Sequence, residues 1–228
     1  MTRASPPYVR QLALGTVVAQ ILFIVAFVAV GTVEGDGYQP MRHDISDLGA
    51  LTAHHATVFR LLLLGAGAVT IAFGLMVVRP VLRSPLAGAL VALSLPAFDN
   101  FSDAFFRLDC RAADAGCTAA QAISSWHAVA HLVCFAIAAL ATVIAPFAMA
   151  RAMDRDDEWR STARQVRWFG VLTVTLLVVT AAASGSPVQG LAQRGAATVI
   201  PVGLAAFAVV VARREPRVSR VAFLMGGR

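Results

Sequence analysis

Six apolar stretches, each long enough to cross a lipid bilayer as a helix, constrain this chain more than any other feature. A helix rises about 1.5 Å per residue, so roughly 20 apolar residues cross the ~30 Å hydrocarbon core. The chain is 58% hydrophobic and only 14% charged, whereas an average soluble domain carries about 25% charged residues. The sequence therefore predicts one all-α integral membrane domain over residues 1–228. Its six predicted transmembrane helices cover about 11–33, 57–78, 84–105, 124–150, 164–184 and 194–212.

Arginine placement predicts the orientation of this bundle. All 19 basic residues are arginine, and fourteen of them flank the predicted helices on the side that holds both termini. The five on the other side are Arg42, Arg60, Arg107, Arg111 and Arg194. Because positive residues concentrate on the cytoplasmic side, we expect a multi-pass inner-membrane protein with both termini in the cytoplasm. Contacts with membrane lipid headgroups explain the net charge of +6, and we expect no nucleic-acid partner.

The first apolar stretch, 11–33, follows a basic N-terminal region, as the apolar part of a secretory signal peptide does. It is longer than that part usually is. We therefore expect the stretch to be retained as a transmembrane helix, with cleavage as the alternative.

Two pairs of ionisable residues at helical spacing mark the third and fourth predicted helices. Asp99 and Asp103 share one face of the third helix, and His127 and His131 share one face of the fourth. If the hairpin between them is symmetric about Ala115, Asp103 lies level with His127 and Asp99 with His131. Ionisable groups within a membrane protein normally face the bundle interior or a wet cavity.

Three interpretations of these four residues stay open. They form a buried polar network that holds helices together, a metal site, or a proton- or ligand-binding site without metal. In a metal site, His127 and His131 would bind zinc with a third ligand. Asp99 and Asp103 are the catalytic candidates, and either acid could instead orient a histidine.

The polar sequence RHDISDLGA in the first outer loop has two interpretations. Asp44 or Ser46 caps a helix that enters the membrane, with Asp47 in its first turn. Alternatively the loop contributes to a site. Arg194, in the sequence GLAQR, anchors the last helix, binds a lipid phosphate or pairs with an outer carboxylate. The binding candidates are therefore His43, Asp44, Ser46, Asp47 and Arg194.

Two of the three cysteines lie seven positions apart in a short outer loop. In an oxidising compartment we expect Cys110 and Cys117 to form a disulfide, with free thiols as the alternative. Cys134, within the fourth predicted helix, is expected to be a small core residue.

The sequences HDISDLGA, HAVAH and GLAQR together resemble a family of bacterial membrane proteins catalogued as domain of unknown function nine-nine-eight. This resemblance covers most of the chain and implies a multi-helix membrane architecture without a particular activity. More distantly, His127 and His131 resemble the HxxxH pair of the alkaline ceramidase and progestin-receptor-like superfamily, with Asp99 or Asp103 as its acid. That resemblance implies an intramembrane zinc that activates water for amide hydrolysis. It also implies a third histidine ligand, which would have to come from His43, His54 or His55. In that superfamily the pair belongs on the last of seven helices, whereas here it lies on the fourth of six.

These observations predict an outward-facing Asp/His pocket between the third and fourth helices, closed by the first and third outer loops. We expect it to bind a lipid or small ligand, or to support a membrane complex. The alternative is a zinc-dependent intramembrane lipid amidase or related hydrolase. The residues decide neither the protein partners nor whether the protein is an enzyme.

Overall fold

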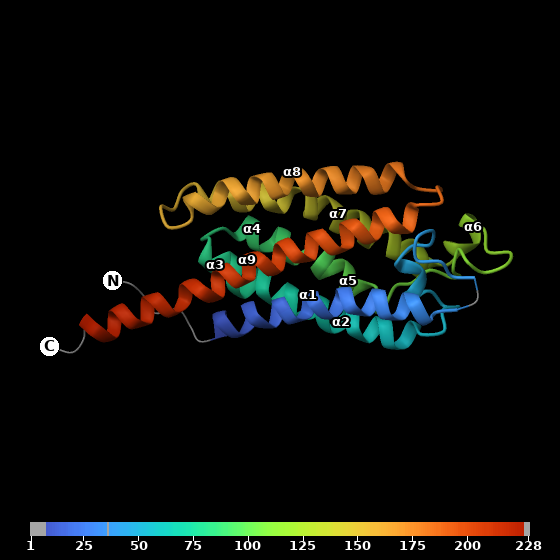
Figure 1. Ribbon diagram of the computed structural model, residues 1–228, viewed down its shortest axis with the longest axis horizontal. Helices are drawn as coiled ribbons and strands as arrows, with labels where there is room; N and C mark the ends of the chain where they lie inside the picture. Colours follow the sequence, from blue (N-terminus) through green and yellow to red (C-terminus); the bar gives the residue numbers. More distant parts are fainter. Residues whose placement is uncertain (1–7, 36, 226–228) are drawn as a thin grey trace.

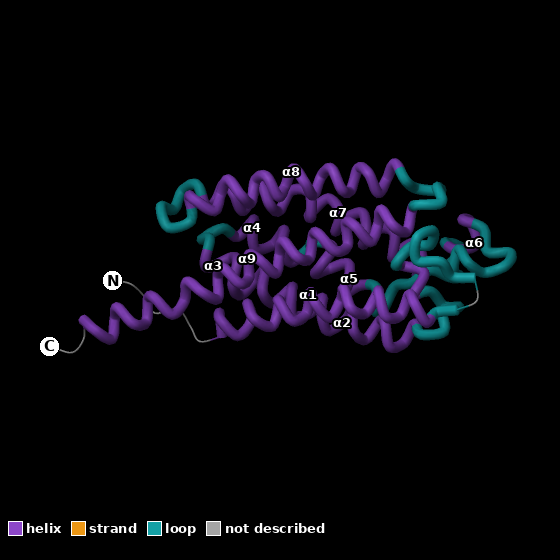
Figure 2. Tube along the Cα trace, viewed as in Figure 1, coloured by secondary structure: helices purple, strands orange, loops and turns teal. Residues whose placement is uncertain are grey.

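The computed structural model describes residues 8–35 and 37–225, and over these residues the chain is helical with no β-strand (Figure 2). In chain order the elements are α1 (Tyr8–Val33), a 3-10 turn (Ser46–Gly49), α2 (Ala56–Phe73), a π-helical turn (Gly74–Val78), α3 (Arg79–Val81), α4 (Pro85–Ala92), a second π-helical turn (Leu95–Asp99), α5 (Asn100–Ser102), α6 (Ala119–Ala122), α7 (Trp126–Met153), α8 (Arg160–Ala182) and α9 (Gln189–Met225).

Five helices are long and apolar enough to cross a membrane. They are Tyr8–Val33, Ala56–Val81, Trp126–Met153, Arg160–Ala182 and Gln189–Arg214. Their outward faces carry large exposed apolar side chains such as Val25, Leu61 and Leu140. A soluble protein rarely exposes so much contiguous apolar surface, whereas a bundle in a bilayer turns such faces toward the lipid. The fold is therefore that of a multi-pass α-helical membrane protein.

The long helices run side by side along the long axis of the molecule (Figure 1). Helix α1 packs against α2 and α9, while α7 packs against α4 and α8. The loops 37–55, 103–125 and 183–188 gather at one end, which we call the loop end. Two apolar cores fill the bundle. The core near the loop end includes Phe23, Phe27, Leu48 and Phe59, and the core near the other end includes Phe73, Met149 and Phe207.

The third predicted helix, 84–105, is not one continuous helix, and this part of the prediction is wrong. Helix α4 ends at Ala92, and Ser94 is extended, with φ −72° and ψ 166°. The cause is Pro96, which lacks a backbone N–H and whose ring clashes with a preceding helical turn. The hydroxyl of Thr142 on α7 accepts a hydrogen bond from the Leu95 amide at 2.8 Å. A membrane protein tolerates such a break where a neighbouring helix satisfies the freed backbone group.

Below the break, the chain approaches α2 unusually closely. A Cβ atom on Gly67 would lie 2.5 Å from the Phe101 amide nitrogen and 2.6 Å from the Ala97 carbonyl oxygen. Only glycine allows this approach without a shift of backbone. The contact holds the segment that carries Asp99 and Asp103 between α2 and α7.

We predict that Gly67→Ala lowers the stability of the protein, because the added methyl group meets backbone atoms that have no rotamer to adopt. The expected loss is about 1–3 kcal/mol, the usual cost of overpacking. Thermal unfolding of the protein in mild detergent measures it. Gly65→Ala on the same helix is the matched control, since nothing lies within 4 Å of its Cβ position, and it should be neutral or slightly stabilising. Equal melting temperatures for the two variants would show that the close approach is not needed.

Candidate functional site

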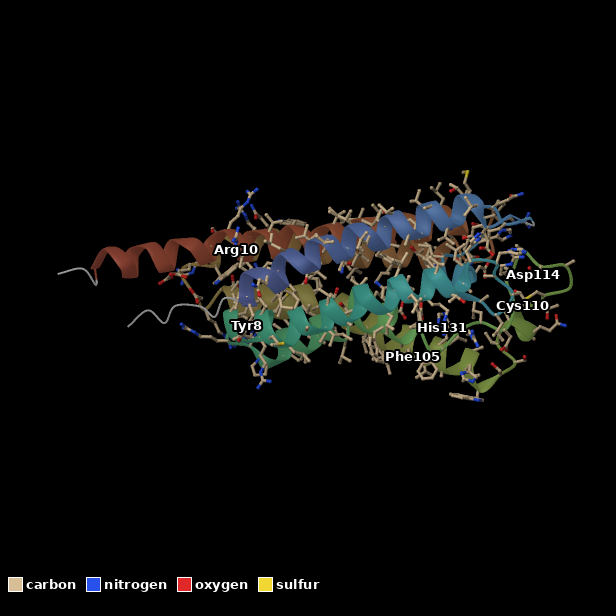
Figure 3. All side chains as sticks on the ribbon, turned by 90° about the horizontal axis from the view of Figure 1, so that it is seen from below. Tyr8, Arg10, Phe105, Cys110, Asp114 and His131 are labelled. Carbon is tan, nitrogen blue, oxygen red and sulfur yellow. A yellow bond between two sulfur atoms is a disulfide. The ribbon has the colours of Figure 1, made fainter. Side chains whose placement is uncertain are left out.

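The centre of the candidate site is an ion pair between the end of the broken third segment and α7. Nδ1 of His131 lies 2.8 Å from Oδ1 of Asp103, and His131 is only 5% exposed. Its ring also forms a hydrogen bond with the backbone of Phe106. These two contacts fix the ring orientation, as acidic partners commonly do for functional histidines. Figure 3 places His131 toward the loop end of the bundle, with Cys110 and Asp114 beyond it.

The expected register of the two helices is wrong by one helical turn. We expected Asp103 to lie level with His127, but it pairs with His131. The connection between α5 and α7 is not symmetric about Ala115, because α6 (Ala119–Ala122) lies only on its α7 side.

Asp99 lies one turn below Asp103 and also borders the site. Its Oδ1 is buried and has no hydrogen-bond partner among the described residues. The same holds for Nε of Arg60 on α2, although the Arg60 guanidinium donates through Nη2 to the carbonyl oxygen of Ala104. Unsatisfied buried polar atoms are rare and costly in native proteins. One acceptor and one donor are therefore available on this wall of the bundle.

Both atoms belong to residues that line one cavity of about 110 Å³. Its polar lining is drawn from several separate segments of the chain, and the remainder is apolar. The principal polar residues are Ser46, Arg60, Asp99, Asp103, His131 and Gln193. The cavity thus joins the first outer loop, α2, the broken third segment, α7 and α9.

His127, the other predicted metal ligand, is placed elsewhere. Its ring stacks on Trp126 with centroids 3.6 Å apart, and it is not among the described residues that line the cavity. Across the described chain, no three His, Cys, Asp or Glu side chains gather in a group able to hold a metal ion. The residues present therefore do not fit the predicted zinc site, because a protein zinc site needs at least three such ligands.

The first outer loop docks onto the start of α9, and this explains the two sequence motifs. Nη1 of Arg194 donates to the carbonyl oxygens of Pro40 (2.5 Å) and His43 (2.8 Å), and Nη2 donates to the Tyr38 hydroxyl. A Cβ on Gly190 would lie 2.4 Å from the His43 carbonyl oxygen. Arg194 therefore binds backbone carbonyls of this loop, which makes it a positioning residue in this structure.

The capping interpretation of this loop is wrong. The turn Ser46–Gly49 is preceded by Ile45, and no side chain among the described residues caps it. The Ile45 amide instead donates to Oε1 of Gln193 at 2.6 Å. Asp44 accepts a hydrogen bond from Nε2 of Gln189 at 2.5 Å. Gln193 of α9 thus accepts a backbone amide of this loop, as a capping side chain would, whereas Gln189 binds the Asp44 carboxylate.

The remaining binding candidates are divided between different surroundings. Ser46 lines the central cavity, whereas His43 and Asp44 line a separate polar cavity of about 420 Å³ at the loop end. Asp47 is 3% exposed, and burial raises the pKa of its carboxyl to about 7, against the lowering effect of a hydrogen bond from Ala112. The structure therefore does not bring the five candidates into one site.

Sequence reasoning missed the most heavily bonded group at the loop end, which is centred on Glu34. Its carboxylate is fully buried and accepts hydrogen bonds from Nη1 of Arg111 and from the His54 amide, both at 2.8 Å. Arg111 in turn pairs with Asp114 at 2.7 Å, and Asp114 accepts a hydrogen bond from the Thr52 hydroxyl. The predicted disulfide between Cys110 and Cys117 is present and closes the loop that carries this pair.

A bundle of apolar helices with a polar cavity near one end defines the protein as a multi-pass membrane protein. The sequence matches the model of the family described as Protein of unknown function (DUF998) over residues 17–224, and the chain belongs to that family. No curated protein and no solved structure matches it. The comparisons confirm the predicted family and do not show the more distant likeness to the ceramidase superfamily.

We predict that Glu34→Gln strongly destabilises the protein, because it leaves the buried Arg111 guanidinium without its full countercharge. Breaking a buried ion pair from one side costs about 3–5 kcal/mol. Asp157→Asn is the matched control, since its pair with Arg160 is 65–88% exposed and should contribute little. Thermal unfolding in detergent compares the two. A Glu34→Gln variant as stable as the control would show that the network contributes nothing to the fold.

Proposed function

We propose that this protein binds a lipid or another small amphiphile in the cavity between Arg60, Asp99, Asp103 and His131. The observation that carries this proposal is the pair of buried polar atoms without partners, Oδ1 of Asp99 and Nε of Arg60, on the wall of one cavity. In a purely structural polar network, each buried donor and acceptor would have a partner within the protein. Here the two atoms without partners border a cavity that has room for a ligand to supply those partners.

The charged pair next to these atoms supports a division of roles. His131 already makes its contacts within the protein, to Asp103 and to the Phe106 backbone. It therefore shapes one wall of the cavity as a positioning residue. Asp99 on the broken segment and Arg60 on α2 are left to contact the ligand directly. The zinc-dependent hydrolase gains no support from this geometry, because the necessary ligands do not converge.

We also propose that the bundle crosses the inner membrane six times, with both termini in the cytoplasm and the loop end outward. The broken segment between Ser84 and Asp103 runs beside α2 and α7, which supports its being the sixth crossing. The arginine-rich turns 79–83 and 151–167 lie at the end opposite the loop end. This distribution follows the positive-inside rule.

We predict that Asp99→Leu removes the ligand without unfolding the protein. Leucine has a similar size and replaces an unsatisfied buried acid with an apolar group, which is often neutral or stabilising. Loss of a hydrogen bond to a charged group should weaken binding by about tenfold or more. Lipid extraction and native mass spectrometry of protein purified in mild detergent measure the retained ligand, and thermal unfolding checks the fold.

Ser102→Ala is the matched control for this experiment. Ser102 is buried nearby and donates to the Asp99 carbonyl oxygen, but it does not line the cavity. It should retain the wild-type amount of ligand. The proposed function is wrong if wild-type protein retains no amphiphile, or if Asp99→Leu retains as much as wild type.

We predict that a membrane-impermeant maleimide labels Ser184→Cys, but not Ser161→Cys, in intact spheroplasts. Both positions are exposed, Ser184 at the loop end and Ser161 at the start of α8. Ser161→Cys should react only after lysis. The unsubstituted chain is the control, because Cys110 and Cys117 are bonded to each other and Cys134 is buried. Labelling of Ser161→Cys alone would reverse the proposed orientation.

A further inference from the structure

A second cavity, of about 230 Å³, lies deeper in the bundle between α4, α7, α8 and α9. Its walls include Met149, Phe169, Leu204 and Phe207. The hydroxyl of Thr142, which also lines it, is already bonded to the Ala138 carbonyl oxygen and the Leu95 amide. The cavity therefore offers mainly hydrocarbon surface to whatever fills it.

The two cavities adjoin each other. Pro96, at the break in the third segment, and Ile200 on α9 line both of them. The first cavity carries the unsatisfied atoms of Asp99 and Arg60, whereas the second has one such atom, the Thr173 hydroxyl oxygen, on a wall that is otherwise mainly apolar. The two adjoining cavities together match an amphiphile, whose polar head would lie near Asp99 and whose hydrocarbon chain would lie near Phe207.

The apolar cavity also reaches the lateral surface of the bundle. Ala206, within the membrane-spanning part of α9, lines it and is itself exposed. Helix α8 packs mainly against α7 and α9, and most of its apolar stretch is exposed. Because this surface faces lipid in a membrane, a hydrocarbon chain has a direct route into the cavity between α8 and α9.

The polar cavity defines the head group by its charges and by its unpaired atoms. Asp99, Asp103, Arg60 and Arg107 line it together with His131, which pairs with Asp103, so side chains of both signs face the cavity. The unpaired atoms are one acceptor, on Asp99, and one donor, on Arg60. A hydroxyl or an amide satisfies both, because each can donate and accept.

We infer that the ligand is a single-chain lipid with an uncharged head that bears a hydroxyl or amide group, and that its chain fills the cavity between α4, α7, α8 and α9. This inference rests on the proposed function and specifies its ligand class. The apolar cavity is smaller than the roughly 300–1,000 Å³ of most small-molecule sites. That size suits one chain better than two.

The test is a binding series with 1-monoacylglycerols from octanoyl to stearoyl, titrated into the purified full-length protein and followed by native mass spectrometry. Wild-type affinity should rise with chain length, because each buried methylene contributes about 0.8 kcal/mol. Thr173→Leu adds volume at a wall residue that is 1% exposed. It should weaken the longest members about tenfold or more, which corresponds to two excluded methylenes, and leave octanoyl binding unchanged.

Two further variants keep the test decisive. Thr173→Val preserves the size of the side chain and removes only its hydroxyl, so it should bind the whole series like wild type. Ala206→Leu, at the exposed mouth of the cavity, should reproduce the loss for long chains if Thr173→Leu does not fold. Equal losses for Thr173→Val and Thr173→Leu would overturn the inference, because the hydroxyl and not the volume would then determine binding.

The outcome also separates this inference from the proposed function. If Asp99→Leu weakens all chain lengths while both filling variants bind like wild type, the amphiphile site stands and the chain lies elsewhere. Competition by phosphatidylglycerol, which has two chains and an anionic head, at the same concentration as monoacylglycerol would likewise overturn the inferred ligand class. If Asp99→Leu binds the entire series like wild type, the proposed function itself fails.

Discussion

The break in the helical backbone before Pro96 is the constraint on which the rest of the structure depends. A straight helix over this segment would direct its acids along one continuous face. The break, whose freed Leu95 amide is satisfied by Thr142, lets the lower part of the segment lie against Gly67 of α2. As a result, Arg60 approaches this segment from α2 and His131 approaches it from α7. The cavity and both of its unsatisfied atoms exist because of this placement.

Much of the fold could be predicted from the sequence, since length, hydropathy and the absence of charge are local properties. They predicted an all-α membrane protein, and the spacing of Cys110 and Cys117 predicted their disulfide. The broken helix could not be placed from composition alone. Pro96 indicated a disturbance, but only the hydroxyl of Thr142, 46 residues beyond it, shows why the backbone can leave the helix there. A hydrogen-bond partner that far away in the chain cannot be identified from the local sequence pattern.

The candidate site was predicted less well, for a related physical reason. Helical spacing correctly placed Asp103 and His131 on facing helices, but the register depended on an asymmetric loop that no periodicity describes. His127 has the same spacing as His131 and instead stacks on Trp126. Glu34 and Arg111 looked like ordinary residues at helix ends, because an ion pair across 77 positions is a property of the folded chain. Residue type thus indicated which side chains can take part in polar chemistry. Only the packing of the folded chain determines which of them lie together in one site.

The docking of the first outer loop onto Arg194 has a consequence for how the protein comes into being. Carbonyl oxygens of Pro40 and His43 find their donor in the last membrane helix, so the nascent chain emerges from the ribosome with this loop incomplete. Nearly the whole polypeptide must be synthesised and inserted before this loop can dock onto α9. A truncated chain that ended before α9 would therefore lack the docked first outer loop as well as one wall of the cavity.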